Sequence, residues 1–66
     1  MKYKVGDLFY CENNEHTYIV FKVEEVEEHK GNPLIYLRDM KSNQTAPFYT
    51  NQLDGFYFYK HIPVGQ

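Results

Sequence analysis

The side chains of this 66-residue chain that are best suited to nucleophilic or metal chemistry are one cysteine and three histidines: Cys11, His16, His29 and His61. A thiolate beside an imidazole base can attack a carbonyl carbon, and closely spaced pairs of cysteines or of histidines can hold zinc. No two histidines here have that spacing, and there is no second cysteine. Cys11 also falls at an inward strand position, where a thiol is usually inert. The sequence therefore predicts no catalytic activity, no metal site and no other cofactor.

Tyrosine is the residue type through which we expect this chain to bind a partner. Phenylalanine and tyrosine alternate through residues 56–59, and Phe9-Tyr10 and Phe48-Tyr49 repeat the same order. Successive side chains of a strand point to opposite faces, so this pattern predicts phenylalanines on a dry face and tyrosines on an outer one. A tyrosine ring offers a large contact area at low entropic cost. The predicted partner-binding tyrosines are Tyr10, Tyr18, Tyr36, Tyr49, Tyr57 and Tyr59.

The same tyrosines also fit a purely structural role. Rings on a thin sheet can pack against cross-strand neighbours while their hydroxyls stay in water. A domain this small also lacks enough polar residues to cover all of its surface. The sequence is consistent with both the binding role and the structural role, and the two roles do not exclude each other.

The only charge cluster consists of Glu24, Glu25, Glu27 and Glu28. In a strand these residues fall on both faces, so neither face can be buried at this point. One interpretation is a solvated strand end whose charges discourage pairing with other chains. The other is an acidic patch that binds a basic partner, including a protein whose natural ligand is nucleic acid.

Length and composition indicate one small domain spanning residues 1–66. Charged residues make up 24% of the chain and the formal net charge is −2, which gives no general electrostatic attraction to duplex nucleic acid. A single cysteine favours a reducing, cytoplasmic location. No apolar run approaches the roughly 20 residues of a membrane span, and residues 1–5 lack a signal-peptide pattern, so we expect no membrane partner.

Turn-forming residues recur at short intervals, as is typical of all-β domains. We expect five strands, at about residues 5–11, 17–29, 34–40, 45–49 and 56–61. A helical or 3₁₀ turn at 50–54 precedes the last strand, with Thr50 as its N-cap and Gly55 at its exit. Asn43 is expected to adopt positive φ in a hairpin turn. Pro47 lacks a backbone donor, so the fourth strand should have a free or bulged edge.

Alternation also predicts the core. The expected inward positions are Val5, Phe9, Cys11, Ile19, Phe21, Val23, Ile35 and Leu37. Val26 has the opposite parity to Val23, and a one-residue slip sends a side chain to the other face. A bulge near Glu24-Glu25 is therefore expected to return Val26 to the core.

This order of elements resembles that of SH3-like small β-barrels, the group that includes SH3, Tudor and KOW-type domains. Three segments carry the resemblance: 5–9 (small-Gly-Asp-x-apolar), 35–39 followed by Ser42-Asn43, and 50–53 before Phe56. The resemblance implies an all-β, five-stranded SH3-like barrel with a short 3₁₀ turn before the last strand. The size and the lack of catalytic signatures also resemble small accessory proteins of bacteriophages.

Three functions remain open from sequence. The first is a non-enzymatic protein-binding module, an adaptor or inhibitor of a larger protein, or a homodimer formed through the same tyrosine surface. The second is a nucleic-acid-binding barrel that stacks bases on tyrosines, with phosphate contacts from lysines and Arg38. The third is an aromatic cage for a cationic ligand, with a carboxylate such as Asp39 beside the rings.

Overall fold

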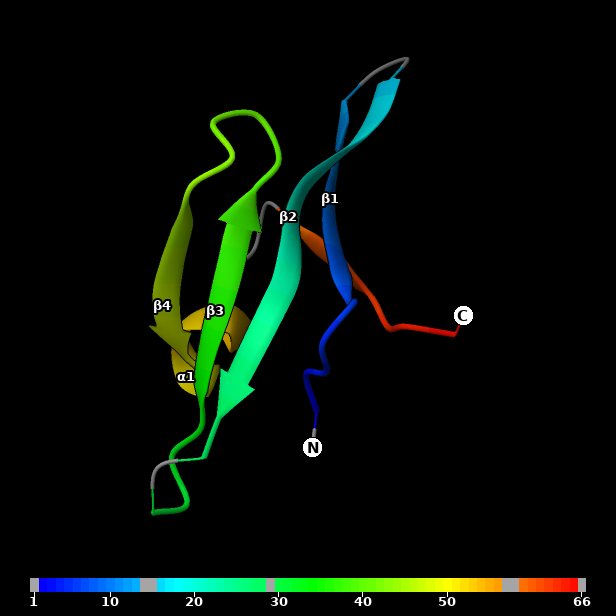
Figure 1. Cartoon of the computed structure of the whole chain (residues 1–66). Helices are drawn as coiled ribbons and strands as arrows, with labels where there is room; N and C mark the ends of the chain where they lie inside the picture. The colour runs from blue at the N-terminus through cyan, green and yellow to red at the C-terminus, as the bar shows by residue number, and fades with distance from the viewer. Residues whose placement is uncertain (1, 14–15, 29, 57–58, 66) are drawn as a thin grey trace.

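The computed structural model describes residues 2–13, 16–28, 30–56 and 59–65 (Figure 1). Its elements are β1 (Leu8–Asn13), β2 (His16–Glu27), β3 (Leu34–Asp39), β4 (Thr45–Tyr49), α1 (Thr50–Asp54) and β5 (Lys60–Ile62). The all-β prediction of five strands with one short helical turn before the last of them is confirmed. The helical turn is a single five-residue α-helix.

The five strands form one antiparallel sheet in the order β4-β3-β2-β1-β5. The chain runs as a meander from β1 to β4, and β5 then returns to pair with β1. Within the described residues β4 and β5 are the two edges of this sheet, so closure into a barrel is not confirmed. Figure 1 shows β1 and β2 continuing past the end of β3 as a two-stranded hairpin.

The predicted bulge in the second strand is confirmed. The β2–β3 register shifts between Val23 and Glu25, and Val26 then packs against the core. The edge position of the fourth strand is also confirmed, because β4 ends the sheet and carries Pro47 at its centre. Asn43 adopts a φ of +66° in the turn between β3 and β4, as expected.

A second bulge, which the sequence pattern does not predict, lies where β1 meets β2. Phe9 pairs with Phe21, but the next residue, Tyr10, pairs with Ile19, so Val20 is the extra residue. Cross-strand partners share a face of the sheet. Ile19 therefore lies on the face of Tyr10, and Tyr18 lies on the inner face opposite Cys11. The predictions of an inward Ile19 and an outward Tyr18 were wrong.

The core consists of six nearly inaccessible hydrophobic residues drawn from most of the chain: Tyr3, Phe9, Val23, Ile35, Leu37 and Leu53. Phe21, Val26, Phe48, Phe56 and Tyr59 pack around them. Val5 is 58% exposed, so its predicted inward position was wrong. The reason is that β1 begins only at Leu8, and Val5 belongs to the turn before it.

The helix α1 begins one residue earlier than expected. Its N-cap is Tyr49, not Thr50, and the side chain of Gln52 accepts a hydrogen bond from the Tyr49 amide at 2.7 Å. Leu53 is the residue through which α1 reaches the core. Gly55 ends the helix, as predicted.

Replacement of Gly6 by alanine is expected to lower the free energy of unfolding by about 1–2 kcal/mol, the usual cost of a left-handed conformation for a residue with a Cβ. Gly6 has a φ of +98°, and an added Cβ would lie 3.2 Å from Cγ2 of Val64. Urea denaturation measures the change. Gly31→Ala separates the two causes, because Gly31 shares a positive φ, +81°, but has no atom within 4 Å of the added carbon and therefore reports the backbone cost alone. Equal stability of the Gly6 variant and the wild type would contradict the prediction.

Candidate protein-binding surface

Tyrosines and glutamates meet on the outer face of β2, β3 and β4. Two cross-strand rows hold them: Glu25 pairs with Tyr36, which pairs with Pro47, and Glu27 pairs with Leu34, which pairs with Tyr49. Neighbouring strands lie about 4.8 Å apart, so each row is about 10 Å wide. We call this surface the outer patch and define it as Glu24, Glu25, Glu27, Leu34, Tyr36, Pro47 and Tyr49.

The outer patch is accessible and electronegative. Tyr49 is 45% exposed, and Pro47 and Glu25 are exposed. The Tyr36 hydroxyl donates a hydrogen bond to Oε2 of Glu27 at 3.4 Å. Partial desolvation raises the pKa of Tyr36, and the negative charges of Glu27 and Glu25 raise it further. The carboxylates therefore create a negative electrostatic potential around the tyrosine rings, which favours a positively charged group beside them.

An ion pair between Arg38 of β3 and Glu24 of β2 forms one border of the outer patch. The guanidinium donates to both carboxylate oxygens, at 2.9 and 3.2 Å. It also donates to the backbone oxygen and the side-chain oxygen of Asn43, at 3.2 and 3.0 Å. The hydrogen bonds from Arg38 lower the pKa of Glu24. Arg38 is thus held at the surface by the turn and by one carboxylate.

The structure brings only some of the predicted partner-binding residues together. Tyr36, Tyr49, Glu24, Glu25 and Glu27 share the outer patch, and Glu28 is exposed just beyond the end of β2. Tyr10 lies on the same face but away from the patch, where it pairs with Ile19 and Lys60. Tyr18 lies on the opposite face. Tyr57 and His29 lie outside the described residues.

The prediction that Tyr59 lies on the exterior was wrong. Its ring centroid is 5.4 Å from that of Phe21 and 5.5 Å from that of Phe56, both in edge-to-face geometry. Tyr59 precedes β5, whose first residue is Lys60, so strand alternation does not govern its direction. It extends the aromatic core instead.

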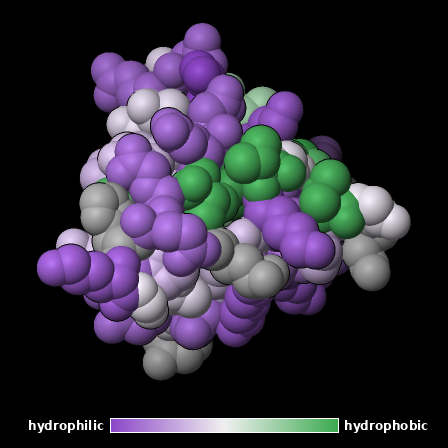
Figure 2. Space-filling model, turned by 60° about the horizontal axis from the view of Figure 1, so that its bottom comes forward, coloured by the Kyte–Doolittle hydropathy of each residue, from purple (hydrophilic) through white to green (hydrophobic). Residues whose placement is uncertain are grey.

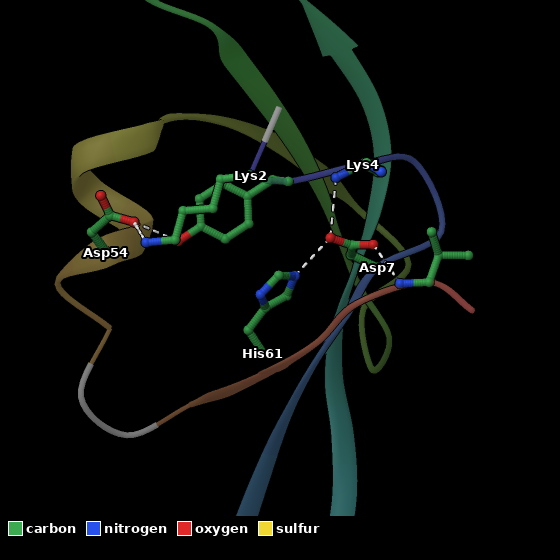
Figure 3. Close-up of polar contacts among 7 residues, drawn as sticks. Lys2, Lys4, Asp7, Asp54 and His61 are labelled. Carbon is green, nitrogen blue, oxygen red and sulfur yellow. Dashed lines mark hydrogen bonds and ion pairs between the residues drawn. The ribbon is translucent and has the colours of Figure 1, made fainter. Parts of the chain in front are cut away.

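A second polar cluster, which sequence reasoning missed, surrounds the buried carboxylate of Asp7 (Figure 3). Asp7 is 1% exposed, and Nε2 of His61 lies 2.6 Å from its Oδ2. The backbone amides of Val64 and Lys4 donate to the same carboxylate at 2.7 and 3.1 Å. Burial alone raises the pKa of Asp7, but the hydrogen bonds from His61, Val64 and Lys4 outweigh it and lower the pKa overall.

The Asp7 cluster ties the two ends of the chain together. Beside it, the Tyr3 hydroxyl and the Lys2 ammonium both donate to Oδ1 of Asp54, at 2.6 and 2.7 Å (Figure 3). Burial and the charge of Asp54 raise the pKa of Tyr3. In many hydrolytic sites an aspartate orients a histidine. Here, however, the other hydrogen-bond donors to Asp7 are backbone amides. This arrangement is a structural tie between the segment before β1 and the segment after β5.

Apolar surface is also exposed near these chain ends. Val5 and Val64 are 58% and 52% exposed, and Val64 lies against Gly6. Figure 2 shows apolar side chains in a short row on this side of the molecule, bordered by hydrophilic ones. The amide of Val64 donates a hydrogen bond to Asp7, so Val64 belongs both to this exposed surface and to the Asp7 cluster.

The described residues considered for nucleophilic or metal chemistry, Cys11, His16 and His61, do not converge. Cys11 lies opposite Tyr18, and a hydrogen bond between the two side chains raises the pKa of Tyr18. His61 is engaged by Asp7, and His16 is at the far end of the β1–β2 hairpin. Among residues 2–13, 16–28, 30–56 and 59–65, no group of three or more His, Cys, Asp or Glu side chains could hold a metal ion.

Comparison of the chain with protein-family models, with curated proteins and with solved structures gives no match. Within the described part of the chain, no helix has the length and apolar character needed to cross a membrane.

Proposed function

We propose that this protein is a non-enzymatic protein-binding module, an adaptor or inhibitor that acts on a larger protein through the outer patch. The observation that carries this proposal is the pair of cross-strand rows in which β2 supplies carboxylates and β3 and β4 supply tyrosines and a proline. Tyrosine is enriched at the centre of protein interfaces, and charged residues surround such centres.

The exposure of Tyr49 favours a role in binding a partner over a purely structural role in covering the sheet. A covering tyrosine packs its ring against cross-strand neighbours. Tyr49 instead leaves 45% of its surface accessible at an edge strand, beside exposed Pro47. Rigid, accessible rings of this kind bind a partner with little loss of side-chain entropy.

The ion pairs of the described residues favour a protein partner over nucleic acid. Six cations were candidates for phosphate contacts: Lys2, Lys4, Lys22, Arg38, Lys41 and Lys60. Three of them, Lys2, Arg38 and Lys60, are each paired with a carboxylate of the same chain, at 2.7, 2.9 and 3.1 Å. Binding of phosphates would require these pairs to break. The outer patch itself carries carboxylates, which repel a phosphate backbone.

The cationic cage has less support than a flat binding surface. Oδ1 of Asp39 accepts hydrogen bonds from the amides of Lys41 and Ser42, at 2.8 and 3.1 Å. Asp39 pairs with Phe21, whereas Tyr36 pairs with Glu25, so the two side chains belong to opposite faces. The carboxylate expected to complete a cage therefore stabilises a turn instead.

The SH3-like arrangement is part of this proposal. A meander of four strands, a helical turn and a last strand that pairs with the first support it. Domains of this architecture host many unrelated functions, so the proposed activity rests on the outer patch and not on the fold.

Affinity capture from nuclease-treated cell lysate tests the proposed function. The tagged wild type is expected to retain one protein in stoichiometric amount, and the Tyr36→Ala/Tyr49→Ala variant is expected to lose it. Tyr18→Ala is the matched control, because Tyr18 is 49% exposed, much like Tyr49, but lies on the other face. Retention of the same protein by the double variant would overturn the proposal, as would a bound species that nuclease removes.

A further inference from the structure

The chain already binds one guanidinium group on this face of the sheet, that of its own Arg38. That group lies between a β2 carboxylate, Glu24, and the oxygen atoms of Asn43. Arg38 is two residues from Tyr36 along β3, so both side chains are on the outer face. The contacts of Arg38 therefore show how a positive charge is held beside this patch.

The next row of the outer patch, that of Glu25 and Tyr36, repeats part of this layout. Glu25 takes the place of Glu24 on β2, and the residue opposite it on β3 is Tyr36 in place of an arginine. No cation of the described residues forms an ion pair with Glu25. In the following row the aromatic ring is that of Tyr49, with Glu28 just beyond the end of β2. Each row thus offers an aromatic face and carboxylates nearby.

We propose that the outer patch binds an extended segment of a partner protein that carries two arginines separated by one residue. This inference rests on the proposed function and names the chemistry of the partner. Tyr36 and Tyr49 are diagonal neighbours on adjacent strands, about 7–8 Å apart, which is close to the separation of about 6.6 Å between alternate side chains of an extended peptide. The two guanidinium groups lie over the rings of Tyr36 and Tyr49, and the first also pairs with Glu25.

Arginine fits this surface better than lysine. Its planar guanidinium stacks on an aromatic face and still donates in-plane hydrogen bonds to a carboxylate, whereas an ammonium group is a compact and strongly hydrated charge. Arg38 binds Glu24 with two donors in this way. The segment is therefore expected to be selected by the shape of the cation and not only by its charge.

The segment lies across the face of the sheet and does not extend it at the β4 edge. Pro47, at the centre of β4, has no amide to donate. The amide of Tyr49 is already bound to the Gln52 side chain at 2.7 Å. An edge that lacks these donors is a poor template for an added strand. The side chains on the outer face remain accessible to a partner.

Titration of the ¹⁵N-labelled protein with a capped Ala-Arg-Thr-Arg-Ala peptide, followed by amide chemical shifts, tests this inference. Shift changes are expected at residues 24–28, 34–36, 48 and 49, with an affinity at least about fivefold higher than that of the matched lysine peptide. Glu25→Gln and Tyr36→Ala are each expected to weaken binding by about two- to fivefold. Glu12→Gln, which removes the same charge from an ion pair with Lys60 far from the patch, is expected to leave affinity unchanged.

Three results would overturn the inference: no shift changes at millimolar peptide, equal affinity for the lysine peptide, or shift changes centred on Tyr18. The capture experiment separates this failure from failure of the proposed function. If the Tyr36→Ala/Tyr49→Ala variant loses its protein partner but the wild type binds no arginine peptide, only the arginine inference fails. If the peptide binds the patch but the double variant keeps its partner, the proposed function fails.

Discussion

Replacement of Asp7 by alanine is expected to lower the free energy of unfolding by about 3 kcal/mol, because the loss of a buried acceptor leaves several hydrogen-bond donors unsatisfied, at about 1–3 kcal/mol each. The carboxylate is 1% exposed and accepts hydrogen bonds from the amides of Val64 and Lys4 as well as contacting His61. Its loss leaves these donors, in partly buried hydrogen bonds, without their acceptor. It also releases the segment after β5 from the segment before β1.

The same residue is expected to make stability depend on pH. The folded state lowers the pKa of Asp7 from its ordinary value of about 3.9. Asp7 therefore contributes its full stabilisation above the unfolded pKa, and this contribution is lost as the pH falls through the lower, folded pKa. The wild type should lose stability from about pH 4 downward, and Asp7→Asn should lose less over the same range.

Urea denaturation at pH 7 and at pH 3, monitored by circular dichroism, checks both expectations. Glu12→Gln is the control, because Glu12 forms an exposed ion pair with Lys60 that is worth at most about 1 kcal/mol. A midpoint for Asp7→Ala equal to that of Glu12→Gln at pH 7 would contradict the structural role of the buried carboxylate.

The parts of the fold that sequence reasoning predicted have local signals. The bulge in β2 is one, because Val23 and Val26 are both apolar but differ in parity, and only an extra residue reconciles them. Pro47 is another, since a residue without a donor is confined to an edge or a bulge.

The second bulge has no such signal. The residues at this bulge, Tyr18, Ile19 and Val20, are common on either face of a strand. No polar residue among them would be forced into the core by regular alternation, so the sequence does not reveal the shift. The shift is visible only once Phe9 is paired with Phe21 and Tyr10 with Ile19. The pairing of strands is therefore needed to place Tyr18.

The burial of Asp7 could not be predicted either, because its partners are distant in sequence. His61 is 54 residues away, and Val64 is 57 residues away. A carboxylate next to a glycine near the start of a chain is ordinarily read as part of a solvated turn. Only the return of β5 to β1 brings these groups around it.

The candidate site was predicted in part. Alternation correctly placed Tyr36 and Tyr49 on one face, and the β2 bulge placed Glu25 opposite Tyr36. It failed for Tyr18, because of the second bulge, and for Tyr59, because that residue precedes its strand. Strand parity is thus informative where a residue lies within a strand that pairs without a register shift, as Tyr36 and Tyr49 do in the β3–β4 pairing.

Replacement of Phe9 by alanine is expected to have the largest effect on this protein. Phe9 is 2% exposed and joins separate parts of the chain. Its ring centroid is 5.8 Å from that of Tyr3, 5.3 Å from the His61 ring in a stacked arrangement, and 6.1 Å from that of Phe56. The substitution of a buried phenylalanine by alanine costs about 3–5 kcal/mol.

That cost is comparable to the whole stability of a domain this small, which rarely exceeds about 3–5 kcal/mol. The Phe9→Ala variant is therefore expected to be largely unfolded at 25 °C, with a collapsed range of amide proton shifts and no near-ultraviolet circular dichroism. Phe9→Leu keeps most of the buried volume, so it should fold with a loss of about 1–2 kcal/mol that urea denaturation can measure. The adjacent Tyr10→Ala removes a ring from the outer face and should cost at most about 1 kcal/mol. If Phe9→Ala were as stable as Tyr10→Ala, the aromatic contacts around Phe9 would not hold the segment before β1, the first strand and the last strand together.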